Sequence, residues 1–158
     1  MPWVSDQLAD PLNRVMEHLI CKLESIDESH WLITSGEESL VRDYDERIDI
    51  FSATPKGENL KRLTSALGYD AEGAYSPDGS KIVFCSIRDA YVRSYFTDKE
   101  KVKLKYDLSY FGEIYIMNSD GSEQKRLTYL PGYDGGPFFS PDGKRIIWRH
   151  FSEKGDTA

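Results

Sequence analysis

The chain has 158 residues, of which 39% are hydrophobic and 13% aromatic, and its formal net charge is −7. This composition is typical of a folded protein and excludes an intrinsically disordered chain, while the acidic balance argues against nucleic acid as a partner. No apolar run approaches the roughly 18 residues of a membrane-spanning helix, so we expect no membrane insertion.

Residues 1–24 are predicted to form a helical capping segment. Asp10 and Pro11 suit the cap and first position of a helix over Asp10–Lys22. Leu19–Leu23 could instead form a degenerate first strand. This segment has no basic start, apolar block or small-residue cleavage site, so no signal peptide is expected. Apolar residues recur at helical spacing as Leu12, Val15, Met16, Leu19, Ile20 and Leu23.

The remaining residues, 25–158, contain an internal repeat with a period of 64. Residues 63–84 and 127–148 are near copies, and both contain Gly-Tyr-Asp followed by Ser-Pro-Asp-Gly. Asp49–Gly57 and Glu113–Gly121 match at the same offset, and each leads into Arg-Leu-Thr. A fixed period indicates a repeat architecture, in which each unit buries its apolar surface against its neighbours.

Turns divide each repeat into short strands. The Ser-Pro-Asp-Gly and Asn-Ser-Asp-Gly segments combine a preset proline φ with a glycine that accepts positive φ. Each turn therefore predicts a hairpin, and two hairpins make a sheet of four antiparallel strands. In the best copy the predicted strands are Ala74–Ser76, Ile82–Ser86, Ile114–Met117 and Lys125–Thr128.

Two of the strands are continuously apolar rather than alternating. Ile82-Val83-Phe84 and Ile146-Ile147-Trp148 predict strands that are covered on both faces. Four-stranded sheets stacked in this way are the blades of a β-propeller. The predicted fold is therefore all-β: a partial propeller with a short N-terminal helix. Its expected units are a three-stranded blade at 25–64, a blade at 65–128 with an insertion at 89–112, and a half blade at 129–158.

The motif string Leu-Thr…Gly-Tyr-Asp…Ser-Pro-Asp-Gly…Glu-Ile-Tyr-Ile-Met-Asn…Arg-Leu-Thr resembles the repeat of TolB-type β-propellers, a WD40-like (PD40) repeat. Tricorn-like and prolyl-oligopeptidase-type propellers share this repeat. The resemblance covers about residues 30–150. It implies a periplasmic or cell-envelope protein, whereas the expected lack of a signal peptide points to the cytoplasm. The chain holds two to two and a half of the family's six or more blades. We therefore expect its partners to be the remaining blades, another protein or a second copy of itself.

One end of the predicted sheets collects aromatic and charged residues. The Gly-Tyr-Asp connections and the insertion meet there, opposite the tight turns, and this composition suits protein recognition. Two plainer interpretations are favoured: the aspartates accept backbone N–H bonds from a turn, and the tyrosines pack between blades. The insertion is expected to be a solvated hairpin or helix arm that Tyr110 and Phe111 dock onto its own blade. The candidate binding residues are Tyr69, Asp70, Glu72, Tyr91, Arg93, Tyr110, Phe111, Tyr133 and Asp134.

Catalytic, metal and cofactor motifs are not found in the sequence. Cys21 and Cys85 have no metal-binding or redox spacing, and Cys85 is expected to be a buried, inert thiol. No Gly-x-Ser-x-Gly elbow, His-Glu-x-x-His helix or phosphate-binding glycine loop occurs. We therefore expect no enzyme activity, no metal and no cofactor. Three interpretations stay open: a TolB-like protein-binding module, the gating propeller of a prolyl-oligopeptidase-type or tricorn-like peptidase with its catalytic domain elsewhere, and a truncated gene product.

Overall fold

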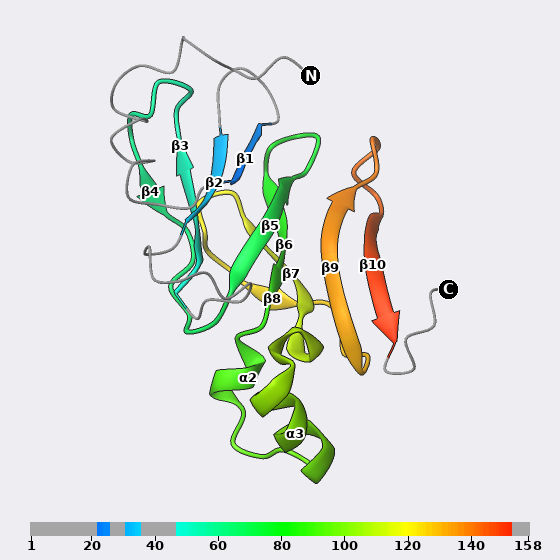
Figure 1. The fold of residues 1–158 in the computed structure, drawn as a ribbon. Helices are drawn as coiled ribbons and strands as arrows, with labels where there is room; N and C mark the ends of the chain where they lie inside the picture. Colours follow the sequence, from blue (N-terminus) through cyan, green and yellow to red (C-terminus); the bar gives the residue numbers. More distant parts are fainter. Residues whose placement is uncertain (1–21, 26–30, 36–46, 153–158) are drawn as a thin grey trace.

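A computed structural model of the protein describes residues 22–25, 31–35 and 47–152, the first two ranges as backbone only. These residues form three antiparallel sheets that follow one another along the chain (Figure 1). The strands are Lys22–Ser25 (β1), Trp31–Ser35 (β2), Asp49–Ala53 (β3), Lys61–Arg62 (β4), Asp70–Tyr75 (β5), Lys81–Ser86 (β6), Glu113–Asn118 (β7), Lys125–Arg126 (β8), Gly132–Phe139 (β9) and Ile146–Ser152 (β10). The first sheet has the order β1-β2-β3-β4, the second β5-β6-β7-β8, and the third pairs β9 with β10.

The predicted all-β fold of four-stranded antiparallel units is confirmed. All the strands predicted between residues 74 and 128 appear as β5 to β8. Most of the predicted N-terminal helix lies outside the described residues, but Lys22, its last residue, begins β1. Lys22 and Leu23 therefore agree with the alternative of a first strand. As a result the first sheet has four strands, where three were expected.

The second and third sheets repeat one register. The pairing of β5 with β6 recurs in β9 and β10 with every partner displaced by 64 positions, and both ladders shift register at the same point. The sequence repeat is therefore a structural repeat down to the β-bulge. The matched partners are Asp70 with Ser86 and Ala74 with Val83 in one ladder, and Asp134 with His150 and Phe138 with Ile147 in the other.

The Ser-Pro-Asp-Gly turns are held by a small hydrogen-bond network. The carboxylate of Asp78 accepts bonds from the Ser76 hydroxyl (2.6 Å) and the Ser80 amide (3.1 Å). These bonds lower the pKa of Asp78 to about 2. Gly79 takes a φ of 70°, the left-handed region that glycine enters without strain. In the second copy of the turn, the equivalent aspartate accepts the same two bonds.

The Arg-Leu-Thr motif closes each four-stranded sheet. The Thr64 hydroxyl accepts a bond from the Ile50 amide (2.9 Å) and donates to Asp49 (3.1 Å). The Arg62 guanidinium pairs with Asp49 and donates to the Thr64 carbonyl (2.9 Å). A buried carboxylate thus gains the partners that burial requires. In the second sheet the same bonds join Glu113, Ile114, Arg126 and Thr128.

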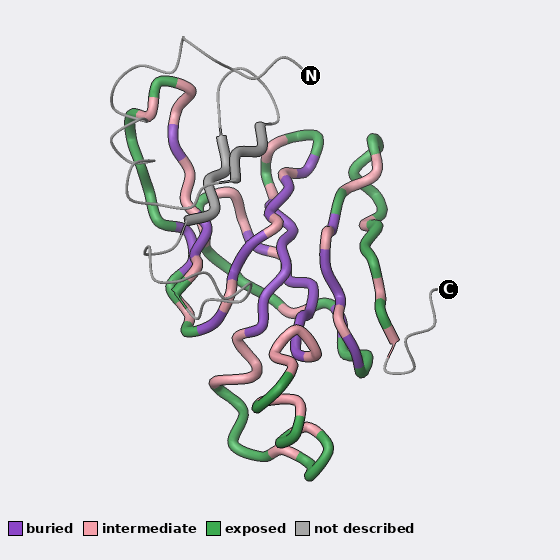
Figure 2. Tube along the Cα trace, in the orientation of Figure 1, coloured by how far each residue is buried: buried purple, intermediate pink, exposed green. Residues whose placement is uncertain are grey.

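Strand β6 lies in the middle of the core, as its apolar run predicts. Its residues 82–86 are buried on both faces (Figure 2). One face packs toward the first sheet and the other toward the third. The first cluster contains Ile50, Leu63, Ile82, Phe84, Tyr115 and Met117, and the second contains Ala74, Val83 and Ile114 with Phe139 and Ile146.

The insertion is a helical arm. It contains α2 (Asp89–Val92), α3 (Asp98–Tyr106) and the 3-10 helix η1 (Leu108–Phe111), and it projects from the end of the second sheet (Figure 1). Helix α3 buries no residue, and Thr97 with Glu100 forms a capping box at its start, so the solvated helix arm is confirmed over the hairpin. None of the described helices is long and apolar enough to cross a membrane.

The part of the arm that carries Tyr110 and Phe111 docks onto the third sheet, where docking onto its own sheet was predicted, whereas Asp89 at the start of the arm bonds to its own sheet. Element η1 packs against β9, and the Asp134 amide donates to the Gly112 carbonyl (2.9 Å). Gly112 permits this approach, because a Cβ there would lie 2.5 Å from the Tyr133 ring. We call this end of the sheets the insertion end, and the opposite end, with the turns at 76–79, 118–121 and 140–143, the turn end.

Candidate functional site

A cavity of about 470 Å³ opens at the insertion end. The helical arm forms one wall, the first residues of β7 and the end of β8 form the floor, and the connection from β8 to β9 forms the opposite wall. Its size is typical of a site for a small ligand or for part of a protein partner. The lining residues are Asp89, Arg93, Glu100, Tyr110, Phe111, Glu113, Arg126, Tyr129, Leu130 and Pro131.

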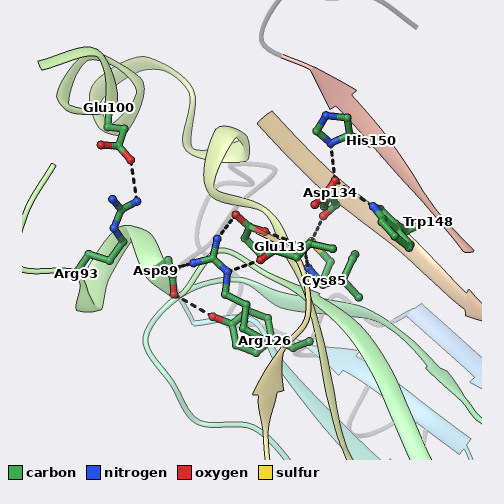
Figure 3. A network of polar contacts seen from close by, with 12 residues as sticks. Cys85, Asp89, Arg93, Glu100, Glu113, Arg126, Asp134, Trp148 and His150 are labelled. Carbon is green, nitrogen blue, oxygen red and sulfur yellow. Dashed lines mark hydrogen bonds and ion pairs between the residues drawn. The ribbon is translucent and has the colours of Figure 1, made fainter. Parts of the chain in front are cut away.

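Arg126 organises the floor of the cavity (Figure 3). Its guanidinium pairs with Asp89 of the arm and with Glu113 of β7, and its Nε donates to the Thr128 carbonyl (2.6 Å). Asp89 also accepts a bond from the Tyr115 hydroxyl (2.9 Å). The arm therefore adds a second carboxylate to an ion pair that the repeat already contains.

Glu113 is a buried carboxyl group whose pKa lies well above its ordinary value. Burial raises the pKa of Glu113 to about 7, although the Thr128 hydroxyl and the Arg126 guanidinium both favour the charged form. Removal from water is the largest effect, and the like charges of the nearby Asp134 and Asp89 carboxylates raise the pKa further. Glu113 therefore changes charge near neutral pH.

The outer part of the cavity contains a second ion pair. Arg93 donates to Glu100 (2.8 Å) and lies 5.0 Å from the centre of the Phe96 ring. Glu100 also accepts a bond from the Thr97 amide (2.8 Å), and this bond, with smaller contributions from the Thr97 hydroxyl and Arg93, lowers the pKa of Glu100. Both guanidinium groups of the cavity are thus already paired with carboxylates of the same cavity.

The wall facing the arm is apolar and exposed. Tyr129 is 70% exposed, and Leu130 and Pro131 beside it are exposed as well. The Arg126 guanidinium lies 4.4 Å from the centre of the Tyr129 ring, a cation–π contact. A large aromatic side chain left in solvent beside charged groups is typical of a recognition surface.

Of the nine predicted binding residues, the structure places Arg93, Tyr110 and Phe111 in this cavity. Tyr69 and Tyr91 are half-buried at the same end, outside the cavity lining. Asp70 and Asp134 are fully buried in the sheets. The sequence prediction missed Asp89, Glu113, Arg126 and Tyr129. The period of 64 could have revealed two of these, because Glu113 and Arg126 match Asp49 and Arg62.

Asp70 and Asp134 are held by side chains, and not by the backbone N–H groups of a turn that were expected. Asp70 accepts a bond from Arg88 (2.7 Å), and burial raises the pKa of Asp70. Asp134 accepts a bond from the Trp148 indole (3.2 Å), and its Oδ1 lies 2.6 Å from His150 Nδ1. These bonds join β5 to Arg88, two residues after the end of β6, and β9 to β10.

Glu72 and Tyr133 join the second sheet to the third. The Glu72 carboxylate accepts bonds from the Tyr133 hydroxyl (3.0 Å) and the Gly136 amide (2.6 Å). Glu72 has a φ of 55°, which is strained for a residue with a side chain, and its repeat counterpart is Gly136 with a φ of 60°. The interpretation of Tyr133 as packing between blades fits this position.

Nothing in the described part of the chain forms a metal centre: no group of three or more His, Cys, Asp or Glu residues could hold an ion there. Cys85 is buried, and burial raises the pKa of its thiol, so the thiolate that would react or bind metal is disfavoured. Its Sγ donates to the Asp134 carbonyl (3.2 Å).

Comparisons with known proteins agree with this architecture. No protein-family model matches the chain. Dipeptidyl-peptidase 5 of Porphyromonas gingivalis is 34% identical over 76 residues, which are 48% of this chain and 9% of the relative. A TolB homologue of Chlorobium chlorochromatii is 27% identical over 122 residues, which cover 63% of this chain and 28% of the relative. The chain therefore spans less than a third of each of these two relatives.

Solved structures show the same fold. A protein assigned as TolB from Agrobacterium tumefaciens matches with a TM-score of 0.58 and 21% identity, covering 86% of this chain and 40% of that one. TolB from Acinetobacter baumannii matches with a TM-score of 0.53 and 22% identity, covering 79% and 25%. The chain is therefore similar in sequence and in structure to TolB propeller regions, and its described residues form a partial TolB-like β-propeller.

Proposed function

We propose that this chain is a non-catalytic, protein-binding propeller module that captures its partner at the insertion end. The observation that carries the proposal is the cavity between the arm and the connection from β8 to β9, with Tyr129 exposed at its edge. At the turn end, the serine and aspartate side chains of the three matched turns bond to one another within each turn.

A binding role fits the cavity better than catalysis does. Its carboxylates and guanidinium groups are paired with one another, and no Ser, Thr, Cys, His or Lys side chain is among its lining residues to act as nucleophile or base. The similarity to TolB supports the periplasm or cell envelope as the compartment and a protein as the ligand. Because the chain spans only part of each relative, these assignments remain part of the proposal.

A second candidate is the propeller region of a peptidase. The 34% identity to part of a dipeptidyl-peptidase favours it, since that similarity is higher than the one to the TolB homologue. Sequencing the coding region on both sides distinguishes the two candidates. A continuous reading frame that encodes an α/β-hydrolase domain with a Gly-x-Ser-x-Gly elbow would support the peptidase, and further repeats alone would support the binding module.

Site-specific photo-crosslinking tests the binding proposal. A photoreactive amino acid replaces Leu130 at the insertion end or, as the control, Lys144 at the turn end; both positions are exposed. In cells of the source organism, we expect Leu130 to give one dominant protein adduct that Lys144 does not give. Equal adducts from both positions, or none from Leu130, would contradict the proposal.

A further inference from the structure

The cavity lining differs in sequence from the matching positions of the first repeat. In the first sheet, the connection that matches Tyr129-Leu130-Pro131 is Ser65-Ala66-Leu67, which lacks the aromatic residue. The arm that supplies Asp89, Arg93 and Glu100 is likewise an addition to the second copy of the repeat. Two elements far apart in the sequence thus depart from the repeat pattern at the same place, and together they form the two walls of one cavity.

The charges of the cavity select the sign of its ligand. Three carboxylates and two guanidinium groups line it, and each guanidinium is paired: Arg93 with Glu100, and Arg126 with Asp89 and Glu113. An anionic ligand would have to displace one of these carboxylates and then face the other two. A cationic ligand balances the remaining negative charge without breaking a pair.

The apolar part of the cavity selects the shape of the ligand. Tyr129 presents a largely exposed aromatic ring, with Leu130 beside it and Phe111 across the cavity. The aromatic rings of this end already attract cations: Arg126 lies over Tyr129, and the Lys103 ammonium lies 5.3 Å from the centre of the Tyr110 ring. An alkyl chain that ends in a cation would contact both the rings and the carboxylates.

We propose that this cavity binds a basic side chain, lysine or arginine, presented by the protein partner. The proposal deepens the binding function given above and rests on it. The net charge of −7 adds to the selection, because an acidic protein attracts basic segments from a distance.

The titration of Glu113 should couple this binding to pH. Glu113 faces Asp89 of α2, Arg126 of β8, Asp134 of β9 and Tyr110 of η1. A cation in the cavity favours the ionised form of Glu113, so binding should release a proton. Because the pKa of Glu113 is about 7, we expect affinity to rise by up to about tenfold between pH 6 and pH 8.

Three capped pentapeptides test the proposal, with the sequences Ala-Leu-X-Leu-Ala and X as lysine, norleucine or glutamate. They are titrated into the ¹⁵N-labelled chain, and the amides of Phe111 and Tyr129 are followed by NMR. We expect saturable shifts with the lysine peptide, binding at least about fivefold weaker with norleucine because it lacks the charge, and no binding with glutamate. Equal binding of lysine and glutamate peptides, or no shifts with lysine at millimolar concentration, would overturn the proposal.

A matched pair of variants locates the binding. Tyr129→Ser introduces the residue found at the equivalent position of the first sheet, and it should weaken lysine-peptide binding at least about fivefold. Leu67→Ala changes an exposed apolar residue in the equivalent connection and should leave binding unchanged. Equal binding by Tyr129→Ser and the unmodified chain would also overturn the proposal. A Leu130 adduct without peptide binding would refute this inference and leave the protein-binding function supported. Peptide binding without a Leu130 adduct would support this inference and contradict the protein-binding function.

Discussion

The second and third sheets are built from the same repeat but lie in different surroundings. Strand β6 is buried along its length, whereas β10 is mostly exposed (Figure 2). Val83 of β6 is fully buried beneath the third sheet, and its counterpart Ile147 of β10 is 68% exposed. Ala74 and its counterpart Phe138 differ in the same way, with Phe138 55% exposed. The prediction that Ile146-Ile147-Trp148 is covered on both faces is therefore wrong for the outer face. An apolar run shows that a strand of this repeat can be buried on both faces. The strand is buried on both faces only where a neighbouring sheet covers it.

Truncating the equivalent aromatic residues of β6 and β10 should give the largest difference in unfolding free energy between the two sheets. Phe84→Ala removes a fully buried ring between the first and second sheets and should lower the free energy of unfolding by about 3–5 kcal/mol. Trp148→Ala acts at the matching position of β10, where the side chain is 39% exposed, and should cost less than half as much. Urea unfolding of both variants measures the difference, and equal losses of unfolding free energy would show that Trp148 is packed as fully as Phe84.

The half-buried Arg126 of the second sheet should contribute more to the free energy of unfolding than its copy Arg62 in the first sheet. Arg126→Met leaves Glu113 and Asp89 without their cation and should cost roughly 3 kcal/mol of unfolding free energy. Arg62→Met removes the equivalent group, but Arg62 is 52% exposed and pairs with one carboxylate, so we expect about 1–2 kcal/mol. Thermal or urea unfolding that ranks the variants in the opposite order would contradict the role given to the arm.

Stability should fall with rising pH because of Glu113. The folded pKa of about 7 lies above the ordinary value of 4.5, so the folded state binds more protons between these two values. The contribution is complete below about pH 4.5, is lost as the pH rises through 7, and amounts to roughly 2–3 kcal/mol. Buried Asp49 and Asp70 also have raised pKa values and add to the slope.

Two variants isolate the Glu113 contribution. In unfolding series from pH 5 to 7.5, Glu113→Gln should flatten the decline, whereas Glu58→Gln, at an exposed position, should keep it. An unchanged slope in Glu113→Gln would show that Glu113 does not titrate in this range.

The open outer face of the third sheet should promote self-association. We propose a second copy as its occupant, because Phe138 and Ile147 form an exposed apolar pair directly opposite each other across β9 and β10. Ile147→Lys should weaken association about tenfold, equal to about 1.4 kcal/mol. Sedimentation velocity over a concentration series measures this, with Lys144→Ala at the turn end as the control; equal association of Ile147→Lys and the unmodified chain would exclude this face.

Most of the fold could be predicted because turns and periodicity are local properties of the sequence. Ser76–Gly79 specifies a hairpin through its own hydrogen bonds, and the buried run of β6 follows from its composition. The site was harder to predict. Asp89 contacts Arg126 because of the direction that the chain takes after β6, which no local motif specifies. The alternating lysines of the insertion did not distinguish a helix from a hairpin. Asp70 and Asp134 carry no signal in the sequence that separates a buried, paired carboxylate from an exposed one.

Amide hydrogen exchange tests most directly whether β10 is a structural copy of β6 with one edge left uncovered in the described structure. Strand β6 is paired on both sides, with β5 and β7, whereas β10 is paired only with β9. We expect all β6 amides between Ile82 and Ser86 to exchange only through global unfolding. In β10, amides that face away from β9 should exchange orders of magnitude faster than those that face it. Uniform protection along β10, equal to that of β6, would show that both edges of β10 are covered.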